Sequence, residues 1–345
     1  MVARFEPIDS PDETTMFPYH ELRIPSIEEI REAMSVVDQH LPHTPLVRSE
    51  WLSAELDAEV YLKREDVFPI GAFKVRGGIN LVSQLDDTFR EQGLIAASTG
   101  NHGQSIAFAG REFDVPVVIC VPEGANPGKV ASMERLGAKV VHHGVDFDEA
   151  REHAEHLATA EGYRYVHSAN EPALIAGVAT AGLEVVEDLP DVEVVISPVG
   201  GGSSASGYCL TVGDLTEATV VGVQSSGAPG MYHAWNEGSL EPYPSMETFA
   251  EGLATRVPFA LTVNILRDRL DDFLLVDDDD IIAALRTMLA EEHILIEGAS
   301  ASAVAGSLAL GDDLAGKHVV LPMSGRNLSL DNLRMVLESR DTTYS

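Results

Sequence analysis

The chain has 345 residues, of which 45% are hydrophobic and 23% are charged, so its composition is that of a globular protein with about two domains. Asp and Glu number 55 against 23 Lys and Arg, which gives a formal net charge of −32 at pH 7. A surface this acidic repels nucleic-acid phosphates and anionic lipid headgroups, so we expect neither nucleic acid nor a membrane as a partner.

Apolar strand-like segments alternate with helix-like segments along the chain. The first helix is expected after Ser26, which is a suitable N-cap because Glu28 and Glu29 follow in the first turn. Strands are expected at 58–65, 93–99, 115–122, 138–143, 163–167, 192–199, 219–226 and 318–325, with helices at 72–85, 101–113, 128–137, 148–162, 173–189, 204–215 and 297–310. The alternation predicts an α/β fold with two open, twisted, mostly parallel sheets flanked by helices.

The remaining features of the composition indicate where the protein works in the cell and say nothing about its reaction. Cys120 and Cys209 each lie in an apolar run outside any CxxC, which indicates buried thiols. The first 25 residues read as an arm without an apolar signal segment, and no 18-residue apolar stretch follows, so we expect a cytoplasmic protein. An acid excess with few lysines is typical of proteins that fold in molar salt and predicts a halophilic protein.

Glycine-containing segments follow several of the expected strands, where α/β folds bind ligands. Residues 69–78 place Lys74 in the first turn of a helix, where burial and the helix N-terminus lower the pKa of an amine and favour Schiff-base formation. Residues 97–104 offer hydroxyl and backbone N–H groups to a carboxylate. Read singly, the first is also compatible with a capping or snorkelling lysine and the second with a plain capping turn.

Two later segments complete the set. Residues 198–207 contain three consecutive glycines whose backbone N–H groups suit a phosphate, although a tight packing turn is the alternative. Residues 323–327 form a turn that is ordinary by itself. Gly200, Gly202 and Ala205 also match the dinucleotide pattern GxGxxA, but the strand that should end in an acid ends at Gln224. This argues against an NAD-dependent oxidoreductase.

Six motifs in chain order resemble the serine/threonine dehydratases of the fold-type-II pyridoxal-phosphate enzymes, a group that includes serine racemase. They are LKREDVFPIGAFKVRGG, STGNHGQSIAFAG, HSANEPALIAG, PVGGGSSASG, LIEGASASAVAG and MSGRN, and they span residues 62 to 327. The resemblance implies a tryptophan synthase β-like fold and pyridoxal 5′-phosphate as cofactor. It also implies a large cofactor-binding domain of residues 1–91 and 170–345, a small domain of residues 92–169, and a homodimer.

The resemblance also implies a role for each matching residue. Lys74 would hold the cofactor as an internal aldimine and later take the Cα proton. Phe73 would pack beside the cofactor, and Asn101 would hydrogen-bond its 3′ oxygen. The phosphate would lie against Gly200, Gly201, Gly202, Ser203 and Ser204, the pyridine nitrogen against Ser324, and the substrate carboxylate against Ser98, Thr99, Gly100 and His102.

The implied activity is the β-elimination of L-threonine or L-serine, which gives a 2-oxo acid and ammonia. Thr99 stands where racemases of the family have a serine as second-face acid/base, so Thr99 is a catalytic candidate and racemisation stays an alternative. A 3-hydroxyaspartate-type dehydratase is a second alternative, and a non-catalytic binding protein that keeps the fold is a third.

Several positions depart from the family pattern. Ala72, Ser203 and Arg326 replace a serine and two glycines, and Arg326 is compatible with a place in the site or on the surface. Glu297 is compatible with a structural role or with a hydrogen bond near the ring. Gln224 and Gly230 stand where some relatives carry the carboxylates of a divalent-cation site, so no metal ligand is expected among the side chains, while a monovalent ion on backbone oxygens stays an alternative.

Overall fold

The computed structural model describes residues 21–339, which divide into two compact units. Residues 43–73 and 179–339 form the first unit, and residues 21–42 and 74–178 form the second. Most of the expected N-terminal arm therefore lies outside the described residues. The domain bounds expected at residues 92 and 169 stay a prediction; in the structure residues 74–91 group with the second unit.

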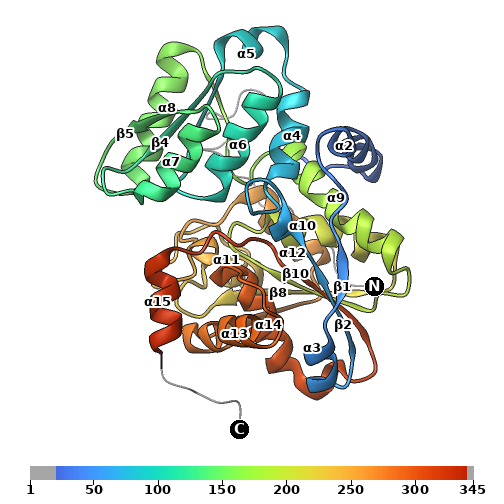
Figure 1. The fold of residues 1–345 in the computed structure, drawn as a ribbon. Coiled ribbons are helices and arrows are strands. Elements are labelled where there is room, and N and C mark those ends of the chain that lie inside the picture. The colour runs from blue at the N-terminus through green and yellow to red at the C-terminus, as the bar shows by residue number, and fades with distance from the viewer. Residues whose placement is uncertain (1–20, 340–345) are drawn as a thin grey trace. The chain divides into compact units, whose positions relative to one another are not determined.

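The first unit contains a six-stranded sheet with the order β1-β2-β10-β7-β8-β9, coloured from blue to red in Figure 1. Only β1 runs antiparallel to its neighbour, and the other pairs are parallel. The bounds are β1 (Leu46–Arg48), β2 (Glu59–Lys63), β7 (Val194–Pro198), β8 (Thr219–Ser225), β9 (Asp272–Val276) and β10 (His318–Pro322).

The helices of this unit pack small residues and apolar side chains against the sheet. In the main core cluster, Ile196 and Val223 of the sheet meet Val304 of a neighbouring helix. A Cβ on Gly306 would lie 2.6 Å from Val223 Cγ2, so glycine permits this close approach. The helices are α3 (Glu50–Glu55), α10 (Ser203–Tyr208), α11 (Gly230–Glu237), α12 (Ala260–Arg269), α13 (Asp278–Ala290), α14 (Gly298–Leu310) and α15 (Leu330–Glu338), with short turns η1 (Glu65–Val67), η2 (Cys209–Gly213), η3 (Glu251–Leu253) and η4 (Gly311–Leu314).

The second unit contains a four-stranded parallel sheet with the order β5-β4-β3-β6. The strands are β3 (Leu94–Ala97), β4 (Val117–Val121), β5 (Lys139–His142) and β6 (Arg164–Tyr165). The helices are α2 (Ile27–His40), α4 (Val75–Ser83), α5 (Asp87–Gln92), α6 (Asn101–Glu112), α7 (Pro127–Arg135) and α8 (Phe147–Glu161), and α9 (Pro172–Asp188) begins in this unit and ends in the first. A Cβ on Gly78 of α4 would lie 2.4 Å from Ser105 Oγ of α6, so this helix pair packs closely.

The structure confirms the expected α/β class with two mainly parallel sheets. It also confirms Ser26 as the N-cap of α2, in a capping box with Glu29. Cys120 and Cys209 are buried and not disulfide-bonded, and burial raises the pKa of the Cys120 thiol to about 11. The helix expected at 204–215 instead changes from α10 into a π-helical turn at η2. Within residues 21–339, no helix is long and apolar enough to cross a membrane.

A fully buried ion pair holds one edge of the first unit. Lys63 Nζ lies 2.6 Å from Glu184 Oε2 and donates to the Thr44 carbonyl at 2.8 Å. The side chains of Lys63 and Glu184 are only 0% and 1% exposed. A buried charge of this kind is tolerated only when its partner is present.

We therefore expect Glu184→Gln to lower the free energy of unfolding by about 3 kcal/mol, because it removes the buried carboxylate 2.6 Å from Lys63 Nζ and leaves the more distant, partly exposed Asp188 carboxylate as counter-ion. Chemical denaturation measures the change. Glu237→Gln, which removes an exposed carboxylate 3.1 Å from His233, is the control and should leave stability unchanged. Equal stability of the parent and Glu184→Gln would contradict the prediction.

Candidate active site

Lys74 is the N-cap residue of α4 and begins the second unit. Its Nζ donates a hydrogen bond to the Ser168 carbonyl at 2.9 Å. Burial lowers the pKa of this amine to about 8, because the charged form loses its hydration. A substantial fraction of the amine is therefore neutral near pH 8 and able to attack a carbonyl carbon.

The loop between β3 and α6 carries the residues expected to bind the substrate carboxylate. Ser98 Oγ accepts the backbone N–H of Gly100 at 3.2 Å and of Gly103 at 2.9 Å. Ser98 therefore satisfies two backbone N–H groups at the start of α6, whose N-cap residue is Gly100. Its own hydroxyl hydrogen is still able to donate, so capping and ligand binding are compatible. A Cβ on Gly100 would meet no atom within 4 Å, so the loop is open at this point.

His102 is a buried polar side chain in the first turn of α6, with 5% of its surface exposed. Its Nε2 lies 3.1 Å from the Val166 carbonyl and so carries the hydrogen, while Nδ1 is buried with no partner among the described residues. Burial, and next the charge of Lys74, lower the pKa of the ring to about 3, so the ring is neutral. Nδ1 therefore offers a lone pair, and this residue is able to donate to a carboxylate only through its backbone.

The glycine loop of the first unit follows β7 and leads into α10. A Cβ on Gly200 would lie 1.9 Å from the Gly252 carbonyl oxygen, and Gly202 has φ +86°. Both positions therefore require glycine, one for space and one for its backbone conformation. Ser197 Oγ donates to Ser204 Oγ at 3.2 Å, so Ser204 keeps its own hydrogen to donate to an anion.

Ser324 lies at the turn after β10 and is 3% exposed. Its Oγ is 3.1 Å from Ser300 Oγ on α14, and its carbonyl accepts the backbone N–H of Phe73 at 3.0 Å. Ser300 also donates to the Gly325 carbonyl and accepts from the Gly325 N–H, both at 2.8 Å. The sequence did not single out Ser300, although its motif LIEGASASAVAG was recognised.

Three residues left open by the sequence now have defined places. The Glu297 carboxylate accepts the Asn327 backbone N–H at 3.2 Å and so holds the 323–327 turn. Arg326 is exposed. Gln224 is fully buried and accepts the Tyr232 backbone N–H at 3.0 Å through its side chain. Within residues 21–339, no group of three His, Cys, Asp or Glu side chains is arranged to hold a metal ion.

The site candidates fall into two sets, each within one unit. The residues present fit pyridoxal phosphate: a glycine cradle and a serine hydroxyl suit its phosphate, a buried serine suits its ring nitrogen, and a buried amine of lowered pKa suits its aldehyde. The first unit holds Phe73, Gly200, Gly201, Gly202, Ser203, Ser204 and Ser324, and the second holds Lys74, Ser98, Thr99, Gly100, Asn101 and His102.

The close approach at Gly200 gives a direct test of the cradle. We expect Gly200→Ala to lower cofactor affinity more than about tenfold, because the methyl group must displace the backbone that shapes the loop. Equilibrium titration of the apoenzyme with pyridoxal phosphate measures the effect. Gly124→Ala, where a Cβ meets no atom within 4 Å, is the matched control and should bind as the parent does. Unchanged affinity in Gly200→Ala would place the phosphate elsewhere.

Comparison with known proteins identifies the family of the chain. The family model of pyridoxal-phosphate dependent enzymes matches residues 37–325. The chain is 36% identical over 313 residues to an L-threonine ammonia-lyase of Thermotoga maritima, covering 90% of this chain and 78% of the relative. It is 33% identical over 320 residues to a catabolic L-threonine dehydratase of Staphylococcus aureus, covering 91% of this chain and 92% of the relative.

A solved structure of the processed form of threonine deaminase isoform 2 from Solanum lycopersicum superposes with a TM-score of 0.84 at 30% identity, over 92% of this chain and 96% of that one. These findings confirm the expected cofactor, fold type and ammonia-lyase group. The chain therefore belongs to the family of pyridoxal-phosphate-dependent enzymes.

Proposed function

We propose that the protein eliminates the β-hydroxyl group of L-threonine or L-serine and releases a 2-oxo acid and ammonia. The observation that carries the proposal is the buried amine of Lys74, whose pKa is lowered to about 8 and whose Nζ is held by a backbone carbonyl. Relatives that carry the names threonine ammonia-lyase and threonine dehydratase support the substrate class.

We assign cofactor contacts to each of the two sets of residues. Pyridoxal phosphate, when bound, supplies an electron sink for the substrate Cα. Lys74 Nζ would hold the cofactor and, as a free amine, would take and hold the substrate Cα proton. Gly200, Gly202 and Ser204 would hold the phosphate, and Asn101 would hold the ring through its 3′ oxygen.

Ser324 would favour loss of the substrate β-hydroxyl over a long-lived negative charge at the substrate Cα. A neutral hydroxyl at the ring nitrogen would stabilise a protonated ring less than a carboxylate does. The cofactor would then draw less negative charge away from Cα. Ser300 and the Gly325 backbone keep the Ser324 turn in place.

The loop of Ser98, Thr99, Gly100 and His102 is the proposed seat of the substrate carboxylate. Backbone N–H groups and hydroxyls make this seat, because the neutral His102 ring offers only a lone pair. Serine and threonine differ by one methyl group, which a pocket discriminates by about 1–3 kcal/mol. Both substrates therefore belong to the proposal.

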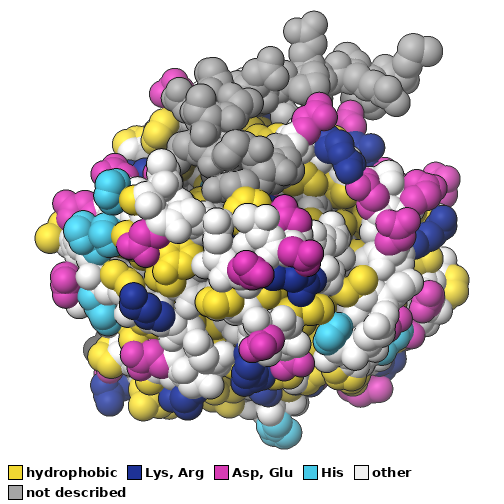
Figure 2. Space-filling model, turned by 90° about the horizontal axis from the view of Figure 1, so that it is seen from above, with side chains coloured by type: hydrophobic (Ala, Val, Ile, Leu, Met, Phe, Trp, Pro, Cys, Tyr) yellow, Lys and Arg dark blue, Asp and Glu magenta, His cyan; other side chains and the backbone are white. Residues whose placement is uncertain are grey.

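The proposal also includes the oligomeric state, the cellular location and the salt conditions of the enzyme. We place it as a homodimer in the cytoplasm of a cell with high internal salt. Figure 2 shows Asp and Glu side chains spread over the visible face rather than gathered in one patch. On this face the distribution supports general salt adaptation, because the acidic side chains are not gathered into one site for a cationic partner.

Replacement of Lys74 tests the reaction. Lys74→Ala should lack the absorbance of lysine-bound cofactor, at about 420 nm, and should form no 2-oxo acid from L-threonine or L-serine. Absorption spectra and a 2-oxo acid assay in high salt measure both properties. Lys139→Ala changes an exposed lysine and should match the parent.

Two outcomes would contradict the proposal. D-amino acid that accumulates faster than 2-oxo acid in the parent would identify a racemase. A parent protein that binds no pyridoxal phosphate would be a fold without the catalysis.

The lowered pKa of Lys74 predicts a pH dependence for cofactor uptake. Only the neutral amine attacks the aldehyde, so the rate should rise about tenfold per pH unit below pH 8 and level off above it. Stopped-flow absorbance of apoenzyme mixed with pyridoxal phosphate measures this profile. The reaction of the cofactor with N-acetyl-lysine corrects for the cofactor's own titration. A midpoint near that of N-acetyl-lysine would contradict the burial argument.

A further inference from the structure

The motif HSANEPALIAG contains Ser168, whose carbonyl group accepts the hydrogen bond from Lys74. The proposed reaction assigns no role to this motif or to the residues just before it. We call residues 164–171 the lysine-holding segment. Ser168, near its middle, accepts the hydrogen bond from Lys74 Nζ at 2.9 Å. The place of the amine therefore depends on what fixes the shape of this segment.

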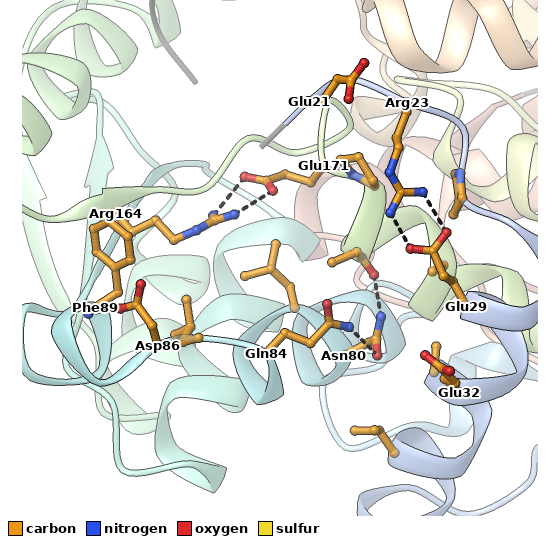
Figure 3. A pocket seen from close by; sticks show the side chains of 18 residues that line it. Glu21, Arg23, Glu29, Glu32, Asn80, Gln84, Asp86, Phe89, Arg164 and Glu171 are labelled. Atoms are coloured by element: carbon orange, nitrogen blue, oxygen red, sulfur yellow. Dashed lines mark hydrogen bonds and ion pairs between the residues drawn. The ribbon is translucent and has the colours of Figure 1, made fainter. Parts of the chain in front are cut away.

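One ion pair closes the segment at its two ends. Arg164 Nη1 and Nη2 donate to Glu171 Oε1 and Oε2, each at 2.9 Å, in a two-bond arrangement that Figure 3 shows directly. The side chains are only 10% and 1% exposed. Paired guanidinium and carboxylate groups in this planar geometry fix both position and orientation. The pair therefore fixes the distance between the two ends of the segment.

A turn inside the segment orients the Ser168 carbonyl group. His167 Nδ1 accepts the backbone N–H of Ala169 at 3.0 Å and of Asn170 at 2.8 Å. Ser168 lies within this turn, so its peptide orientation follows from the two hydrogen bonds. The preceding Val166 carbonyl accepts from His102 Nε2 at 3.1 Å, which ties the segment to α6.

The far end of the segment is tied to the helix that Lys74 begins. Asn80 Nδ2 on α4 donates to the Ala173 carbonyl at 2.7 Å, two residues beyond Glu171 (Figure 3). Lys74 is the N-cap of the same helix. The amine and the carbonyl that receives it are thus held by one connected set of bonds within the second unit.

We infer that the Arg164–Glu171 pair positions the catalytic amine, by holding the Ser168 carbonyl where it receives Lys74 Nζ whenever this nitrogen is not bound to the cofactor. Arg164 and Glu171 are positioning residues, because they act through Ser168 and touch neither cofactor nor substrate in this account. The inference rests on the proposed role of Lys74. It adds a requirement for a fixed Ser168 carbonyl, which neither the glycine loop nor the substrate loop provides.

The pair also keeps water from the amine. His102 is a titratable group that interacts electrostatically with Lys74, and burial keeps its ring neutral. The lowered pKa of Lys74 is therefore a result of burial. A loosened segment admits water and raises this pKa towards that of an exposed lysine. Arg164 and Glu171 line a cavity of about 600 Å³, from which water reaches a weakened pair.

The test uses Glu171→Gln and Arg164→Lys, with Glu184→Gln as matched control. Glu184→Gln breaks a comparably buried pair that does not belong to the segment. Each protein is stripped of cofactor, and the rate of pyridoxal phosphate uptake is followed from pH 6 to 10, together with the melting temperature. Uptake reports on the amine itself, so substrate turnover is not needed.

We expect Glu171→Gln to move the pH midpoint upwards by about one unit, which lowers the rate below pH 8 about tenfold. Arg164→Lys keeps the cation but loses the second hydrogen bond, and it should give a smaller shift in the same direction. Glu184→Gln should lower the melting temperature without moving the midpoint. If Glu171→Gln fails to fold, Arg164→Lys carries the same comparison.

An unchanged midpoint in the folded segment variants would overturn the inference, and so would an equal shift in Glu184→Gln, since both mean that the pair affects stability alone. If the parent protein takes up cofactor with the pH midpoint expected for Lys74, the proposed function stands even when the inference is overturned. A parent that forms no lysine-bound cofactor would overturn the proposed function and the inference together.

Discussion

The burial of one amine is the constraint on which the chemistry of this protein depends. An exposed lysine is almost entirely protonated at neutral pH and is a poor nucleophile, whereas burial lowers the pKa of Lys74 to about 8. A buried nitrogen must still donate its hydrogens, and the Ser168 carbonyl accepts one of them. Low basicity and a fixed position therefore arise from the same surroundings.

Glycine allows close approaches of the backbone in both units. At Gly200, Gly78 and Gly306 an added Cβ would lie 1.9, 2.4 and 2.6 Å from a neighbouring atom, so the backbone approaches that neighbour as only glycine permits. The close packing of α4 on α6 supports the helix that Lys74 begins, and the approach at Gly200 shapes the proposed phosphate loop. Helix packing and the proposed phosphate binding thus both require glycine at particular positions of the sequence.

The strong acidity of the chain is a property of its surface, while two of its buried cations each pair with a buried carboxylate. Lys63 pairs with Glu184, and Arg164 pairs with Glu171, in each case with nearly complete burial of the carboxylate. Buried pairs are costly to break from one side, so each holds a definite local geometry. The first pair joins Lys63 of β2 to α9, and the second closes the segment whose Ser168 carbonyl receives Lys74 Nζ.

The sequence by itself determined the alternation of strands and helices, the N-cap at Ser26 and the cofactor family, because periodicity, capping and motif order are local or linear properties. Lys74 and the glycine loop stood out for the same reason. The tertiary structure alone decided that Ser168 receives the amine, that Ser300 supports Ser324 and that the His102 ring is a neutral acceptor. These facts depend on partners as far apart as Lys74 and Ser168, and on burial, and neither is visible in a linear pattern.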